Sequence, residues 1–297
     1  MKKKYRDIFD TRGTRIFSIF NYIFLIGISV LCLLPILNVL AISFSSSSAA
    51  NANLVRFWPI DFTTKSYEII FSRPDISAAL WVSIKRTLLG VLINNVLTIL
   101  MAYPLSKTNK QFPGRNIYMY SLIFTMLFSG GLVPLYVLVN NLHMINSIWS
   151  LILPGAVPVF NVILMMNFFR QLPKEIEEAA YIDGASNMQC LLKVIIPLSL
   201  PVIATVTLFQ FVGHWNDWFG GLIFMNNVKF YPLQTLLQST LSSGDIKNLE
   251  QAKMFAEVSD RTLKAAQIFV TTLPILILYP FLQKYFAKGI VLGSVKG

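Results

Sequence analysis

The fold is decided near the start of the chain by residues 16–42, which read IFSIFNYIFLIGISVLCLLPILNVLAI. This stretch holds no Asp, Glu, Lys, Arg or His, and it exceeds the roughly 20 apolar residues that a helix needs to cross a bilayer. A secretory signal peptide would have a shorter apolar core followed by a small-residue cleavage pattern. We therefore interpret this stretch as a retained first membrane span.

Five further stretches lack Asp, Glu, Lys and Arg over about 18 or more residues, the length of a membrane-crossing helix. Because hydrocarbon offers no partner for backbone N–H and C=O groups, such stretches are helical, or irregular only where protein or a water-filled path covers them. The sequence thus predicts an all-α integral membrane protein with six transmembrane helices. The five stretches are residues 87–106, 117–139, 148–169, 196–216 and 265–283.

The composition agrees with a membrane protein, because 55% hydrophobic and 13% charged residues are too apolar a mixture for one soluble core of 297 residues. The net charge of +11 does not indicate nucleic acid, since Lys and Arg lie between the apolar stretches and form no stripe with interleaved aromatics. We expect the lipid bilayer as a partner. The expected organisation is an N-terminal segment (1–15), one six-helix membrane domain (16–283) and a C-terminal tail (284–297).

The orientation follows from the distribution of Lys and Arg between the loops. With the N-terminus inside, fifteen of these residues lie on the inner side and ten on the outer side. The short outer loop 140–147 has no Lys or Arg, and under the positive-inside rule it is the short loops that indicate the orientation. Both termini are therefore predicted to be cytoplasmic, and residues 43–77 and 226–264 are predicted to be outer loops.

The inner loop at residues 172–197 reads as two short helices. The first follows Pro173, carries glutamates near its positive end and stops at Gly184, while Ser186 and Gln189 form a capping box for the second. Small side chains at Ala179 and Ala180 let another protein approach, and nearby carboxylates can pair with its basic residues. The alternative is a hairpin lying on lipid headgroups, against which the loop's four acidic residues argue, because that leaflet is anionic.

This loop contains Glu178-Ala179-Ala180, then Gly184 after three residues, and then Val194-Ile195-Ile196-Pro197 after nine more. This pattern resembles the EAA loop of ABC importer permeases. The family pattern ends on Ile, any residue, Leu and Pro, so Val194 and Ile196 are conservative departures. The resemblance implies a type I importer fold and a loop that inserts into a cleft on a separate nucleotide-binding subunit. The residues that it implies for this coupling are Glu178, Ala179, Ala180, Asp183, Gly184 and Pro197.

Further motifs resemble the second permease of maltose-type carbohydrate importers. This resemblance implies a bacterial plasma membrane location, a second homologous permease, two ATPase subunits that bind ATP and Mg, an extracellular solute-binding protein and an oligosaccharide substrate. Residues 128–136 and 213–218 look like a branch whose systems are similar to importers of polysaccharide fragments, including uronate-containing ones. The maltose-type motifs are Trp58-Pro59, Phe62-Thr63, Ser66-Tyr67, residues 102–106 (AYPLS) and residues 182–186 (IDGAS).

The tail beyond residue 283 also resembles that of the maltose-type second permease, which reaches between the two ATPase subunits. Its glycines at intervals of four predict a poor helix, and a frayed terminus is the alternative. The residues expected to contact the ATPases are Gly293, Ser294, Val295, Lys296 and Gly297.

Two groups are candidates for the substrate path. Gly130 and Gly131, with Pro134, can unwind the third span so that carbonyls face a sugar near Tyr136, although close helix packing explains small residues as well. At the outer end of the fifth span, aromatic rings can stack on sugars and polar groups can bind hydroxyls, although an interfacial aromatic belt is the alternative. This second group is Trp215, Asn216, Asp217 and Trp218.

Other polar residues have plainer interpretations. Lys85 and Arg86 are expected to extend to the headgroups. His143 and His214 have no neighbouring ligand cluster, so we expect no metal site and interpret both as hydrogen-bonded structural residues.

Other functional classes fit the sequence less well. An ion-coupled secondary transporter would place carboxylates or histidines within its spans. A membrane enzyme would need a nucleophile or an acid and base on one face, and the sequence offers only isolated candidates. A structural or sensor protein would be indicated by a lack of stimulated ATP turnover in a reconstituted complex. The chain has no Gly-x-x-x-x-Gly-Lys-Ser/Thr loop, so ATP hydrolysis is expected on another subunit. A permease for another solute class, such as an amino acid or phosphate, stays open.

Overall fold

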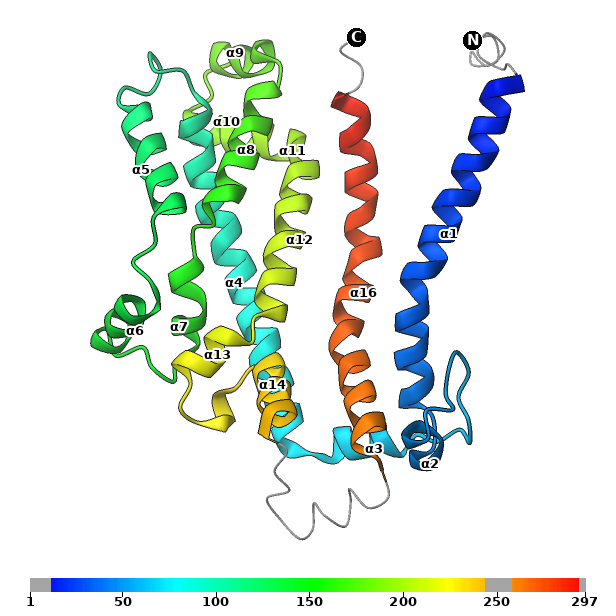
Figure 1. Cartoon of the computed structure of the whole chain (residues 1–297). Coiled ribbons are helices and arrows are strands. Elements are labelled where there is room, and N and C mark those ends of the chain that lie inside the picture. The colour runs from blue at the N-terminus through cyan, green and yellow to red at the C-terminus, as the bar shows by residue number, and fades with distance from the viewer. Residues whose placement is uncertain (1–11, 244–257, 294–297) are drawn as a thin grey trace. The chain divides into compact units, whose positions relative to one another are not determined.

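The computed structural model describes residues 12–243 and 258–293, most of which are helical, and none of these residues forms a β-strand (Figure 1). The chain divides into two compact units. One comprises residues 1–72 and 246–270, and the other comprises residues 73–245 and 271–297. Helix α16 (Asp260–Gly293) contributes its first part to one unit and the rest to the other.

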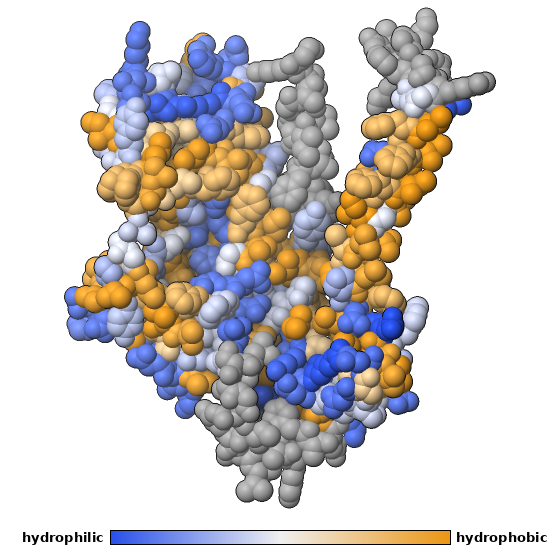
Figure 2. Space-filling view, viewed as in Figure 1, coloured by the Kyte–Doolittle hydropathy of each residue, from blue (hydrophilic) through white to orange (hydrophobic). Residues whose placement is uncertain are grey.

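The smaller unit contains α1 (Arg12–Ser43), α2 (Ser47–Asn51), α3 (Lys65–Ser72) and the start of α16. The side chains of α1 are apolar and exposed over most of its length, which Figure 2 shows as a continuous hydrophobic surface. A small core forms where α1 ends, from Ala41, Ile42, Ala49, Ala50, Val55 and Ala265. The serine run 45–48 caps this turn: Ser46 Oγ accepts the Ala49 N–H, and Ser45 Oγ donates to the Ala41 carbonyl at 2.6 Å.

The larger unit is built around α4 (Pro74–Ser106), which packs against α5, α7, α8, α12 and α14. Small residues such as Gly90 permit the close approach of α12, because a Cβ at Gly90 would lie 2.5 Å from Nε2 of His214. The other elements are α5 (Arg115–Leu127), α6 (Leu132–Asn141), α7 (Ile148–Ile152), η1 (Leu153–Gly155), α8 (Val159–Gln171), α9 (Lys174–Ile182), α10 (Asn187–Cys190), η2 (Leu191–Ile195), α11 (Ile196–Leu198), α12 (Leu200–Asn216), α13 (Phe219–Phe224), η3 (Val228–Phe230) and α14 (Leu233–Ser243).

The core of this unit lies toward the end of α4 and joins it to α8, η2 and α12. Ala102, Met165, Cys190 and Val206 are completely or almost completely buried in this core. The buried thiol of Cys190 behaves here as a small apolar side chain. The core therefore holds the inner loop 172–197 against the membrane helices.

Three helices, α1, α4 and α16, are each long and apolar enough to cross a membrane. The other three stretches are bent pairs: α5 with α6 at 111°, α7–η1 with α8 at 49°, and α10–α11 with α12 at 81°. The breaks have local causes. Gly131 has φ +87° before α6, and Pro158 and Pro201 stand at the starts of α8 and α12, where a proline lacks the N–H that would continue a helix. The number of six spans stays a prediction.

Several boundaries differ from the sequence expectation. The second helix begins at Pro74, not at residue 87, and α2 and α3 lie within the expected outer loop 43–77. The loop expected at 226–264 contains η3 and α14, while residues 244–257 lie outside the described residues. The expectation of a poor helix after residue 283 is wrong up to Gly293, where α16 ends. An existing helix gains one hydrogen bond for each residue added, which offsets the glycines.

Candidate functional site

The inner loop folds as two short helices joined by a glycine turn, as the sequence predicted. Helix α9 ends in a Schellman motif: the Gly184 N–H donates to the Tyr181 carbonyl at 3.0 Å, and the Ala185 N–H donates to the Ala180 carbonyl at 2.9 Å. Gly184 has φ +81°, a conformation that other residues adopt only with strain. The turn therefore depends on glycine at position 184.

The predicted capping box starts α10. Ser186 Oγ accepts the Gln189 N–H at 3.3 Å, and Gln189 Oε1 accepts the Ser186 N–H at 2.8 Å. The chain then makes a π-helical turn, η2, and passes through Pro197 in α11 before the bend into α12. Pro197 thus lies between the loop and the membrane helix.

The outer face of this loop is exposed and carries charge. Glu178, Ala179, Asp183 and Gly184 are exposed, Ala180 is half-buried, and Ile182 is 86% exposed. Neither Glu178 nor Asp183 forms an ion pair with another described residue. In the larger unit, α9 lies at the end where α4 stops and α5 starts, and α13 and α14 lie at the opposite end (Figure 1). Hydrophilic side chains gather at the α9 end, above a band of apolar ones (Figure 2).

The inner face of α9 is fixed to the end of α4 by a polar cluster around Glu177. Glu177 Oε1 pairs with the Lys107 ammonium and lies 2.9 Å from the Tyr181 hydroxyl and 3.3 Å from the Tyr103 hydroxyl. The Lys107 ammonium also lies 4.1 Å from the centroid of the Tyr103 ring. The Tyr181 hydroxyl is 2.9 Å from Asn187 Oδ1 in α10. Both loop helices are therefore attached to α4.

A second polar cluster lies where α12 ends. The Arg86 side chain is 2% exposed; its guanidinium pairs with the Asp217 carboxylate and donates to the Asp217 carbonyl at 2.8 Å. Asp217 Oδ1 accepts the Gly220 N–H at 3.0 Å. Burial alone would raise the pKa of Asp217, but the Arg86 charge and this N–H hold it below its usual value.

This cluster changes the interpretation of several residues. Arg86 does not extend to headgroups. Helix α4 begins at Pro74, twelve residues before Arg86, and places the Arg86 side chain against the end of α12. Lys85 instead lies over the Trp81 ring, 5.2 Å from its centroid.

His214 is structural, as expected, with Nε2 3.1 Å from the side-chain amide of Asn94. His143 is exposed with φ +54°, and its backbone N–H donates to the Asn140 carbonyl at 2.9 Å, so its place in the described structure is that of a turn residue.

The candidates for the substrate path have different surroundings. Trp215 is 4% exposed and its indole N–H donates to the Thr271 carbonyl at 2.8 Å, so its ring is not free to stack on a sugar. Asn216 and Trp218 are exposed; Asn216 Oδ1 accepts from Gln234 at 3.4 Å. Among the candidates of this group, these two side chains are the more accessible ones.

The third span is unwound at its glycines. Added Cβ atoms would meet nothing within 4 Å at Gly131 and only Pro134 Cβ, at 3.8 Å, at Gly130, so close packing does not explain these glycines within the described chain. The chain breaks between α5 and α6 at this point. Tyr136 follows in α6, and its ring stacks on Phe224 with centroids 6.4 Å apart. A role in the substrate path stays a prediction.

Comparison with known proteins identifies the family. The profile of the family described as "Binding-protein-dependent transport system inner membrane component" matches residues 94–292, about two thirds of the chain. The chain belongs to this family. The matched range includes the loop around Glu178, the unwound third span and the residues that follow α12.

Individual relatives of this permease cover almost its whole length. It is 41% identical over 289 residues to Protein LplC of Bacillus subtilis (strain 168), covering 97% of each chain. It is 39% identical to the polygalacturonan/rhamnogalacturonan transport system permease protein YtcP of the same strain, covering 95% of this chain and 99% of the relative. Its fold matches a chain in the crystal structure of a bacterial ABC transporter involved in the import of the acidic polysaccharide alginate, with 31% identity, a TM-score of 0.85, and coverage of 94% and 99%. The predicted ABC importer permease fold is confirmed.

Sequence reasoning missed the residues that hold the permease's loop in place. It singled out Glu178 but passed over Glu177, which faces inward, and its partner Lys107. One signal was present: Glu177 and Tyr181 are four residues apart and therefore share a helix face that differs from that of Glu178. The tail residues Ser294, Val295, Lys296 and Gly297 lie outside the described residues, and Gly293 is the last residue of α16.

Proposed function

We propose that this permease and a second, homologous permease together form the membrane path for a uronate-containing oligosaccharide, which an extracellular solute-binding protein delivers. The transport systems of two relatives support this substrate class, because polygalacturonan and alginate are both acidic polysaccharides. The proposal also places both termini in the cytoplasm, on the basis of the Lys and Arg distribution.

The observation that carries the proposal is the exposed α9–α10 loop, which is fixed to α4 through Glu177 and presents Glu178, Ile182 and Asp183 outward. An exposed apolar side chain between two carboxylates without described partners suits a protein interface that has an apolar centre and charged edges. We propose that this surface docks on a separate ATPase subunit, which binds ATP and Mg. The permease would then transmit ATP-driven movement and carry out no hydrolysis itself.

Reconstitution of the complete importer in proteoliposomes tests this function. We expect oligogalacturonides, presented with the binding protein, to stimulate ATP hydrolysis and to be transported, and neither amino acids nor phosphate to compete. In the variant Glu178→Lys, stimulated hydrolysis should fall about tenfold or more, since a charge-assisted contact contributes roughly 1.5–3 kcal/mol. Glu175→Lys is the matched control, with the same charge change on the same helix.

The outcomes separate the alternatives. Equal losses in Glu178→Lys and Glu175→Lys would contradict a specific role for position 178. Transport without ATP in vesicles with an ion gradient would indicate a secondary transporter. Purification of the chain as a homodimer that transports sugar without a second permease would contradict the heterodimer.

A further inference from the structure

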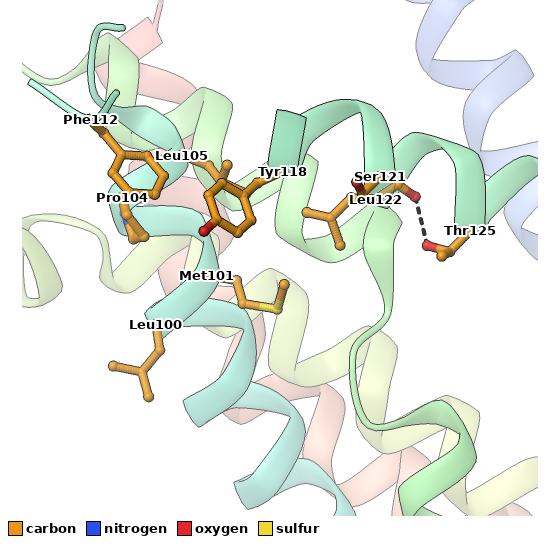
Figure 3. A pocket seen from close by; sticks show the side chains of 9 residues that line it. All are labelled: Leu100, Met101, Pro104, Leu105, Phe112, Tyr118, Ser121, Leu122 and Thr125. Atoms are coloured by element: carbon orange, nitrogen blue, oxygen red, sulfur yellow. Dashed lines mark hydrogen bonds between the residues drawn. The ribbon is translucent and has the colours of Figure 1, made fainter. Parts of the chain in front are cut away.

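A groove of about 480 Å³ lies between α4 and α5, close to the end of the larger unit that carries α9. Figure 3 shows that side chains from the last turns of α4 form one wall and side chains from α5 form the other. The lining residues are Leu100, Met101, Pro104, Leu105, Phe112, Tyr118, Ser121, Leu122 and Thr125.

The lining of the groove suits a hydrocarbon chain better than a sugar. Only three of its lining residues carry a hydroxyl, and two of these donate to their own helix: Ser121 Oγ to the Ile117 carbonyl and Thr125 Oγ1 to the Leu122 carbonyl, both at 2.9 Å (Figure 3 shows the second bond). The third is Tyr118, whose ring stacks on Phe112 with centroids 5.5 Å apart. A sugar would lose its hydrogen bonds to water here and find few replacements.

Helix α5 has no fully buried residue in the described chain, although it packs against α4 and α8. Phe124, for example, is 60% exposed. Met119 and Leu122 of this helix are only partly buried against the core, so a ligand held between α4 and α5 would add apolar contacts to both helices.

The loop that joins these two helices supplies positive charge at one end of the groove. Residues 107–116 contain three basic residues and no acidic one, and of these only Lys107 forms an ion pair with a described carboxylate. The Arg115 guanidinium donates to the Leu105 carbonyl at 2.7 Å, and Arg170 from α8 donates to the same carbonyl at 3.3 Å. Two guanidinium groups thus meet beside a residue of the groove, with exposed Lys110 in the same loop.

We propose that this groove is a binding site for an anionic phospholipid, with an acyl chain between α4 and α5 and the phosphate near Lys110, Arg115 and Arg170. Basic pockets between membrane helices favour anionic headgroups, and the apolar walls suit a chain of methylene groups. The site is separate from the loop around Glu178.

Photolabelling of the complete importer in bilayers tests the site. The probes are phosphatidylglycerol and phosphatidylcholine that carry the same diazirine-modified acyl chain. We expect adducts on peptides spanning residues 100–105 or 118–125, and about fivefold or greater preference for phosphatidylglycerol, as expected for each basic residue near an anionic headgroup. Equal labelling by both lipids, or labelling elsewhere, would overturn the proposal.

Variants locate the two halves of the site. Leu122→Trp fills the groove and should abolish the adduct, whereas Phe124→Trp, on the same helix but outside the lining, should leave it unchanged. The double variant Lys110→Gln with Arg170→Gln should lower the preference for phosphatidylglycerol, since only Arg115 of the three basic residues remains, while labelling by phosphatidylcholine persists. Gel filtration and basal ATP hydrolysis confirm that each complex assembles.

A second permease is the rival occupant. A photoreactive amino acid at position 121 reports which molecule lies in the groove. Adducts with lipid support the site, and adducts with the second permease in place of lipid overturn it.

Discussion

At the scale of single residues, Arg86 is the side chain whose environment matters most for stability. A guanidinium with 2% exposure has little contact with water, and its charge is compensated by the Asp217 carboxylate and carbonyl. Removing one partner of a buried ion pair leaves the other charge without compensation.

The first prediction follows for Asp217→Ala. We expect it to destabilise the importer by about 3 kcal/mol, the lower end of the range for breaking a buried pair, because Asp217 is itself partly exposed. The measurement is thermal unfolding of the purified complex, with Glu175→Ala as an exposed acidic control. Replacing both partners, as Arg86→Met with Asp217→Leu, should restore much of the loss. An unchanged midpoint in Asp217→Ala would show that water reaches Arg86 in the complex.

The second prediction concerns the pair of Lys107 and Glu177. The variants Lys107→Met, Glu177→Gln and their combination form a double-mutant cycle, and we expect an interaction energy of about 1–3 kcal/mol because the two groups are in direct contact. The readouts are the stability of the complex and the ratio of stimulated to basal ATP hydrolysis. The ratio should fall in each single variant, since the loop loses its attachment to α4. Additive effects would mean that the pair does not act as a unit.

The residue scale also shows what the sequence could and could not predict. Ser186, Gln189 and Gly184 were assigned correctly because a cap or a turn depends on neighbours a few residues away. The pairs Arg86–Asp217 and Lys107–Glu177 join positions that are 131 and 70 residues apart. Nothing within a local window indicates which of several charged residues will meet.

At the scale of elements, the long helices were predictable and their breaks were not. The apolar length of residues 16–42 was sufficient to predict α1. The start of α4 was missed because its first turns contain Asp75, Ser83 and Arg86, and these are helical through contacts with other elements, such as the bond between Ser83 Oγ and the Leu233 N–H at 2.8 Å. Hydropathy alone assigns such polar turns to a loop.

The third prediction concerns the turn between α9 and α10. In Gly184→Pro, the proline removes the N–H that bonds to Tyr181 and imposes a negative φ where the chain has +81°. Membrane insertion should persist, because no span is altered, and sugar-stimulated ATP hydrolysis should be lost.

Gly184→Ala is the graded control for this turn. A Cβ would meet nothing within 4 Å, so the only penalty is the left-handed conformation, of roughly 1–2 kcal/mol. We expect this variant to retain partial coupling. Normal coupling in Gly184→Pro would contradict a role for the turn.

At the scale of the whole molecule, the described residues contain one loop of the kind that we propose docks on an ATPase, while a pair of ATPases would use two. This agrees with the proposed heterodimer, in which each permease contacts one ATPase. The resemblance of the tail to that of the maltose-type second permease predicts a second contact, between the two ATPases.

The fourth prediction tests this tail. Deleting residues 294–297 should lower transport and ATP turnover while the complex still assembles, because Lys296 would lose a charge-assisted bond at the ATPase interface. Substituting Lys296→Met alone should reproduce part of the loss. Full activity after the deletion would show that these residues are not needed for coupling.

The continuity of α4 has a mechanical consequence. Arg86 lies in α4 and Lys107 directly follows its last residue, 21 residues further on, so the cluster at the end of α12 and the α9–α10 loop are separated by about 30 Å along one helix. A continuous helix that moves as a rigid body displaces both of its ends together. In the proposed importer, a movement at one end of α4 would therefore reach the other end without a relay of side-chain rearrangements, and the stiffness of the helix would set how much of the movement is transmitted.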